Sequence, residues 1–158
     1  MPHVYRGFSL IELLVVLAVL GILAAMAMPL SEVTVQRERE RELKRALWEI
    51  RDALDAYKAA RTNGAIPGDL GALPYPPTLS ALVIVTPDAR AEHKGEVMRF
   101  LRSVPRDPFA EPDVPAEKTW ALRSYLSEAD DPKPGADVYD VHSRSERTGL
   151  NGLPLGKW

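Results

Sequence analysis

Glu12 has the most unusual chemical setting in the chain, because it is a carboxylate inside an otherwise uncharged run. Residues 8–30 contain no other charged side chain. An ionised carboxylate in such a run is strongly unfavourable unless a partner neutralises it, so it normally marks a function. Glu12 also lies near one end of the run, where its carboxylate could reach lipid headgroups. The residue types therefore indicate either charge pairing with a partner or a snorkelling side chain.

The remaining polar residues form no catalytic motif. The chain has no cysteine, which excludes disulfides, thiol catalysis and thiolate metal sites. Asp140, His142 and Ser143 suggest a triad by type, but their spacing supplies no nucleophile geometry, and we expect His142 to be a surface residue. Phosphate-binding glycine loops and the HExxH and GxSxG motifs are absent. The net charge of −2 gives no general attraction to nucleic acid. The sequence therefore predicts that the chain is not an enzyme.

The run that contains Glu12 predicts a membrane helix. At roughly 1.5 Å per residue, a helix over residues 8–30 is about 34 Å long, enough to cross a bilayer core of about 30 Å. A cleaved secretory signal would have a shorter apolar region, of about 7–15 residues. Arg6 precedes the run with no acidic residue before it, which favours a cytoplasmic amino terminus. We therefore expect the distal part of the chain on the opposite side of the membrane.

Residues 31–61 are predicted to continue this helix, with one face against a partner surface. The apolar positions recur at helical spacing, and Ala46 and Trp48 widen the stripe. Residues 37–42 alternate in charge, which favours a solvated face over salt bridges between subunits. Asn63-Gly64 provides a stop. The whole helix would then be about 80 Å long. The stripe consists of Leu43, Leu47, Ile50, Leu54 and Tyr57.

The distal residues 62–158 predict short elements joined by turns. Residues 76–83 suit a short helix, and residues 96–101 suit another helical turn. Alternation over residues 119–126 indicates a strand, and residues 138–141 are typical of its partner.

The six residues from Gly7 to Glu12 resemble the class III signal of type IV pilins and of type II secretion pseudopilins. The resemblance implies that a prepilin peptidase cuts between Gly7 and Phe8 and N-methylates Phe8. It supplies a partner for Glu12, namely the new α-amino group at Phe8 of a neighbouring subunit. Pro29 falls where the family commonly carries a proline, and a proline there favours a kink.

The order of the distal motifs is similar to that of the major pseudopilins of type II secretion. These motifs are residues 75–79, 104–109, 120–125, 137–141 and 150–158. The resemblance implies an α+β fold, in which a long N-terminal helical spine packs on a small C-terminal antiparallel sheet with short helices between.

The resemblance also implies how the chain is organised and where it works. Residues 1–7 would be a leader, 8–30 the transmembrane and assembly helix, 31–61 the amphipathic continuation and 62–158 the periplasmic part. The subunit would sit in the bacterial inner membrane and polymerise into a periplasmic pseudopilus that drives secretion. Its partners would be further copies of itself, minor pseudopilins, the inner-membrane assembly platform and the prepilin peptidase.

Major pseudopilins also bind calcium in their C-terminal loop, and no other cofactor is expected. Calcium needs several oxygen ligands. The loop here offers Glu146 and Asn151, and Asp137 and Asp140 could contribute only if the loop folds back. If no metal binds, we expect Trp158 to close the loop against the sheet.

Two alternatives stay open from the sequence. The chain could be a type IV or competence pilin subunit, which shares the same N-terminal signal. From a different class of protein, it could be a single-pass periplasmic binding module that never assembles.

Overall fold

The structure is a computed structural model that describes residues 8–68, 71 and 73–158, with the backbone alone for 25–31. One long helix, α1 (Leu10–Thr62), forms the first element. The chain divides into two compact units, residues 1–38 and 39–158, and α1 runs through both. This confirms the prediction of a single continuous helix. Asn63-Gly64 ends it as expected, with φ of 80° at Gly64.

The first unit consists of the N-terminal part of α1. Its large apolar side chains from Leu10 to Leu23 are all exposed. Among the residues that the structure describes, no helix has a stretch both long and apolar enough to span a membrane. The predicted membrane span covers residues 8–30. The structure does not describe the side chains of residues 25–30, so this finding does not cover the whole predicted span.

The second unit is built around the C-terminal part of α1, whose predicted core positions are confirmed. Leu43, Leu47, Ile50 and Leu54 are no more than 2% exposed. Burying each such side chain contributes about 1.5–3 kcal/mol, so this face docks the helix firmly. The four side chains pack in one core with residues of the distal segments, namely Leu79, Leu82, Leu101, Trp120, Val138, Val141 and Leu155.

Trp48 does not widen the buried stripe as predicted. Its side chain is 68% exposed, whereas Ala46 is buried. The helical repeat explains the difference, because residue 48 lies on the side of α1 opposite Ile50 and the core.

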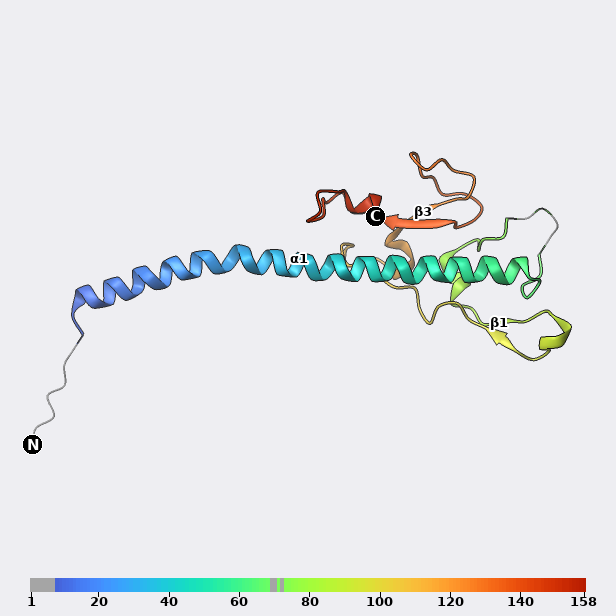
Figure 1. The fold of residues 1–158 in the computed structure, drawn as a ribbon, viewed down its shortest axis with the longest axis horizontal. Helices are drawn as coiled ribbons and strands as arrows, with labels where there is room; N and C mark the ends of the chain where they lie inside the picture. The colour runs from blue at the N-terminus through green and yellow to red at the C-terminus, as the bar shows by residue number, and fades with distance from the viewer. Residues whose placement is uncertain (1–7, 69–70, 72) are drawn as a thin grey trace, which may run out of the picture. The chain divides into compact units, whose positions relative to one another are not determined.

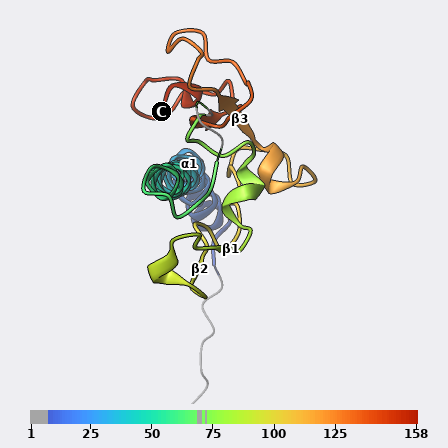
Figure 2. The same ribbon diagram turned by 90° about the vertical axis from the view of Figure 1, so that its right-hand side faces the viewer.

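Two small antiparallel sheets lie on different sides of this part of α1 (Figures 1 and 2). Strands β3 (Trp120–Arg123) and β4 (Asp140–Ser143) pair with Trp120 opposite Ser143. The expected strand pair is confirmed, although β4 begins two residues later than predicted. Strands β1 (Thr86–Pro87) and β2 (Val97–Met98) form the second sheet.

The helical turn predicted at residues 96–101 is wrong, because part of it is β2. Gly95, with φ of 96°, reverses the chain before it. The Asp88 amide then donates to the Glu96 carbonyl at 3.0 Å, which closes the hairpin. Met98 packs on a small cluster formed by Ala60, Ala65 and Ile66.

Short 3₁₀ turns complete the fold: η1 (Leu79–Leu82), η2 (Ala91–His93), η3 (Ala116–Lys118) and η4 (Leu155–Lys157). The element η1 confirms the short helix predicted within residues 76–83, as a single tight turn. The α+β class expected from the pilin-like resemblance is confirmed: a long N-terminal helix packs on small antiparallel sheets.

Candidate functional site

Of the predicted processing and assembly residues, the structure describes Phe8 and Glu12, near the start of α1. Gly7 falls outside the described residues. Phe8, two residues before the helix begins, is 77% exposed, and Glu12 is exposed in the first turn. Pro29 lies within α1, but its side chain is outside the description, so the kink stays a prediction.

Ser9 caps the helix on which Glu12 sits. The Glu12 amide donates to the Ser9 hydroxyl oxygen at 3.3 Å, and the Leu13 amide donates to the Ser9 carbonyl at 3.3 Å. The spacing Ser9-x-x-Glu12 is that of a capping box, a signal that sequence reasoning missed. A carboxylate in the first turn is also stabilised by the helix dipole. Glu12 therefore has a local structural role that is compatible with pairing to a partner.

The apolar side chains around Glu12 contact no core. Leu10, Ile11 and Leu13 are 79, 71 and 52% exposed. Such a continuous apolar surface marks contact with another molecule or with a membrane. The site can thus hold a charge beside an apolar surface, which suits docking and not catalysis.

The calcium candidates occupy different settings at the other end of the chain. The buried Asp137 carboxylate accepts hydrogen bonds from the Ser124 hydroxyl at 2.5 Å and the Tyr125 amide at 3.1 Å. Asp140 accepts from Arg51 at 2.8 Å. Calcium at either aspartate would compete with these donors for the carboxylate oxygens.

The other two calcium candidates lie in the exposed C-terminal loop. Glu146 is exposed, and the Asn151 side-chain oxygen accepts from the Leu153 amide at 3.0 Å. Among the described residues, Asp137, Asp140 and Glu146 do not form a group that could share an ion. Calcium binding at these positions thus stays a prediction.

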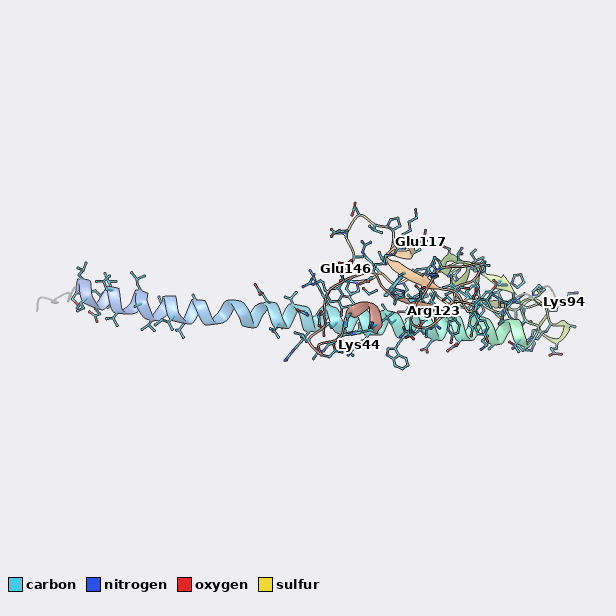
Figure 3. All side chains as sticks on the ribbon, turned by 90° about the horizontal axis from the view of Figure 1, so that it is seen from above. Lys44, Lys94, Glu117, Arg123 and Glu146 are labelled. Carbon is cyan, nitrogen blue, oxygen red and sulfur yellow. The ribbon has the colours of Figure 1, made fainter. Side chains whose placement is uncertain are left out.

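The C-terminal segment instead docks on α1, through residues that sequence reasoning did not identify. The Leu150 amide donates to the buried Glu40 at 2.8 Å. The Trp158 ring lies against Lys44, with Nζ 4.5 Å from the ring centroid, and Figure 3 shows Lys44 beside this segment. Trp158 therefore packs on the helix, and its role in closing the loop stays a prediction. Glu40 is an exception to the solvated face predicted for residues 37–42, whose other members are exposed.

Arg51 joins α1 to two distant segments. Its guanidinium donates to the Asp140 carboxylate at 2.8 Å, to the Val141 carbonyl at 3.2 Å and to the Trp158 carbonyl at 2.8 Å. A single arginine beside the apolar stripe of α1 gives no sequence signal for this role. Arg51 therefore positions β4 and the chain end against the spine.

No triad forms around His142. Asp140 pairs with Arg51, and the Ser143 hydroxyl donates to the buried Asp107 at 2.6 Å. The His142 ring nitrogen Nδ1 lies 3.2 Å from the Ser143 carbonyl oxygen. These contacts are structural, and they leave no nucleophile beside the imidazole.

Among the described residues, one group of Asp, His and Glu side chains could share a metal ion. This group lies in the β1–β2 hairpin. Ligand atoms of Asp88, His93 and Glu96 lie within 4.8 Å of one another. Arg90 already neutralises Asp88, with Nη2 2.5 Å from Oδ2. Hydrogen bonding by this guanidinium lowers the pKa of Asp88 from 3.8 to about 2. The cluster is explained as an ion pair that stabilises the hairpin.

Comparison with known proteins points to the N-terminal segment. Residues 3–28 match the family model of the prokaryotic N-terminal methylation motif. The chain is also similar to the fimbrial protein EcpB of Eikenella corrodens, 36% identical over 62 residues. That match covers 39% of this chain and 37% of the relative. No solved structure matches. The N-terminal segment thus carries a type IV pilin-like methylation motif, and both matches support a structural protein over an enzyme.

Proposed function

We propose that the chain is a pilin-like filament subunit, made as a precursor and processed at its methylation motif. The main observation behind this proposal is the match of residues 3–28 to the methylation motif. The matched segment contains Gly7, Phe8 and Glu12. Cleavage after Gly7 frees the α-amino group of Phe8, and methylation follows there. The exposed apolar surface of the first unit then contacts lipid before assembly and neighbouring copies after it.

Glu12 would direct assembly by neutralising the Phe8 amino group of an adjacent copy. Leaving either charge alone in apolar surroundings is unfavourable, so the pair sets the register between copies. The exposure of both residues at the start of α1 supports this, because neither is used by the fold beyond the cap at Ser9.

The filament that we propose is a periplasmic pseudopilus that drives type II protein secretion. The anchored subunit would have its amino terminus in the cytoplasm and its second unit in the periplasm. Its partners would be minor pseudopilins, the inner-membrane platform and the prepilin peptidase. The order of the distal motifs, which is similar to that of major pseudopilins, supports this choice. The chain also lacks the cysteine pair that long type IV pilins usually carry.

A second candidate, a fimbrial type IV pilin subunit, is favoured by the similarity to EcpB. Deletion of the gene separates the two. Loss of secreted proteins with cell-surface fimbriae unchanged supports the pseudopilus, and loss of fimbriae with secretion unchanged supports the second candidate.

Mass spectrometry of the mature amino terminus tests processing. In cells that contain the prepilin peptidase, we expect the chain to begin at a methylated Phe8. Deleting the peptidase should leave the residues before Phe8 attached to the chain. A chain that still carries these residues in cells with active peptidase would contradict the proposed function.

Substitutions at Glu12 test assembly separately from processing. Glu12→Leu and Glu12→Gln should both be inserted and cleaved but remain unassembled on sedimentation. Glutamine can still serve in a capping box, so the second variant isolates the charge. Ser9→Ala removes the cap alone and should still assemble. Polymer from Glu12→Gln at the wild-type level would reject charge pairing.

A further inference from the structure

The C-terminal loop contains a tight turn that presents two leucines to the outside. The Gly152 amide donates to the Gly149 carbonyl at 2.9 Å, and the Gly149 amide donates to the Leu153 carbonyl at 2.9 Å. Turns of this kind normally carry small or polar residues. Here Leu150 and Leu153 are 46 and 54% exposed. We call residues 149–153 the leucine tip.

The leucine tip is held in place on α1, at the start of the second unit. The Leu150 amide donates to the buried Glu40 carboxylate at 2.8 Å. A β-carbon at Gly149 would lie 2.5 Å from a ring carbon of Trp158, so the absence of a side chain lets the turn approach this ring. The same ring lies against Lys44. The leucines are therefore displayed by a turn with a defined position.

The chain around the leucine tip differs in charge from the rest of the distal part. Residues 144–158 carry three basic and one acidic side chain, whereas residues 62–143 carry eight basic and thirteen acidic ones. The exposed Arg147 lies at the base of the tip, where its carbonyl accepts from the Leu155 amide at 2.9 Å. The exposed Lys157 follows two residues later. Exposed leucines flanked by basic side chains are typical of a surface that binds anionic lipids.

We infer that the leucine tip rests on an anionic membrane surface, with Leu150 and Leu153 between the headgroups and with Arg147 and Lys157 beside lipid phosphates. The inference rests on the proposed function, which anchors the same chain through residues 8–30. It adds a second lipid contact, made by the unit outside the membrane before the subunit enters a filament.

The length of α1 places this contact within reach. Glu40, which holds the tip, follows the end of the predicted span by ten residues, or about 15 Å of helix. The headgroup layer accounts for roughly 5–7 Å of this distance. A tilt within the range of about 0–40° found for membrane helices lowers one side of the unit further. The leucine tip would thus determine which side of the unit faces the lipid.

Fluorescence quenching tests the contact in the full chain, because the chain contains no native cysteine. A fluorescent NBD group is attached at Leu153→Cys, Glu42→Cys or Leu17→Cys, one position per chain. Glu42 is the matched control, because it lies two residues after Glu40 and therefore on the opposite side of α1 at nearly the same height. The chains are reconstituted at low density into phosphatidylcholine vesicles, with or without phosphatidylglycerol, and a nitroxide-labelled lipid is the quencher.

We expect quenching at position 17 in both kinds of vesicle. In vesicles with phosphatidylglycerol, quenching at position 153 should exceed that at position 42 by about threefold, because anionic headgroups attract the basic side chains. Without phosphatidylglycerol, or in high salt, quenching at position 153 should fall to the level at position 42.

Charge reversal tests which cations bind the lipid. Arg147→Glu together with Lys157→Glu should abolish the excess quenching at position 153. Lys94→Glu together with Arg99→Glu, at exposed positions of the β1–β2 hairpin, should leave it unchanged. Excess quenching that survives both the first pair of substitutions and high salt would overturn the binding of anionic headgroups.

The three probe positions separate this inference from the proposed function. Quenching at position 17 with equal quenching at 153 and 42 would overturn the lipid contact and leave the proposed anchored subunit standing. An unquenched probe at position 17 would overturn both. An emission shift at position 153 that depends on protein density, without quenching by lipid, would assign the tip to a second copy and also overturn the lipid contact.

Discussion

The two halves of α1 share one backbone conformation but differ in what surrounds them. From Leu10 to Leu23, the large apolar side chains are between 49 and 79% exposed. From Leu43 to Leu54, the apolar stripe is at most 2% exposed, and the opposite face carries charges and Trp48. The first half thus depends on other molecules to cover it, whereas the second is covered by its own chain.

This difference separates two tasks within one helix. The second half is positioned by a core, by Arg51 and by the C-terminal segment, so its outward face has a defined arrangement. The first half offers an apolar surface with one carboxylate, which suits many similar contacts along a polymer. Under the proposed function, Glu12 would set the register of the contacts made by the first half.

The largest expected effect comes from matched leucine deletions in the two halves. Leu47→Ala should lower the free energy of unfolding of the second unit by about 2–5 kcal/mol, because it leaves a cavity in the core. Leu17→Ala, at a position 64% exposed, should leave it unchanged. Denaturant unfolding of the detergent-solubilised full chain, followed by tryptophan fluorescence, measures both. Equal effects of the two substitutions would remove the distinction between the halves.

A smaller effect is expected from Arg51→Ala, which frees β4 and the chain end from α1. We expect a loss of about 1–2 kcal/mol, since Arg51 is partly exposed and its acceptors can turn to water. Hydrogen exchange at the Leu155 amide, which donates to the Arg147 carbonyl at 2.9 Å, should accelerate. Arg51→Lys should recover only part of the loss, because lysine lacks the planar fork. Unchanged exchange in Arg51→Ala would show that the core alone holds this segment.

The smallest effect concerns the β1–β2 hairpin, which packs near the end of the second half. The folded pKa of Asp88 is lowered to about 2, so its contribution to stability is complete above about pH 4. It is lost as the pH falls through about 2. Asp88→Asn should therefore lower stability at pH 7 and lose less stability than the wild type between pH 4 and 2.

Unfolding curves at several pH values measure this contribution. Asp113→Asn, at an exposed aspartate, is the matched control and should follow the wild type throughout. If the stability of Asp88→Asn fell in parallel with that of the wild type between pH 4 and 2, the ion pair with Arg90 would add no stability.

Much of the helix was predictable because its signals are local. The spacing of Leu43, Leu47, Ile50 and Leu54 identifies the buried face, and Asn63-Gly64 marks the end. The capping box at Ser9 and Glu12 was equally local and could have been recognised.

The errors arose where neighbours in space outweighed neighbours in sequence. Trp48 is a different kind of error, because the helical repeat alone places it opposite Ile50 and could have been read from the sequence. Residues 97–98 have no strand alternation long enough to detect, and pairing with Thr86–Pro87 makes them a strand. Glu40 belongs to a run that suits solvent, and only the arrival of Leu150 buries it.

By itself, the sequence determined the long helix, its core-facing positions and the carboxylate within the methylation motif. These follow from helical periodicity, hydrophobicity and a short motif, which act within a few turns of the chain. Only the tertiary structure decided that Arg51 and Glu40 hold the C-terminal segment, over separations of 107 and 110 residues. Only it brought Trp120, Val141 and Leu155 onto the buried face of α1. Which side of a helix is free depends on what the rest of the chain covers.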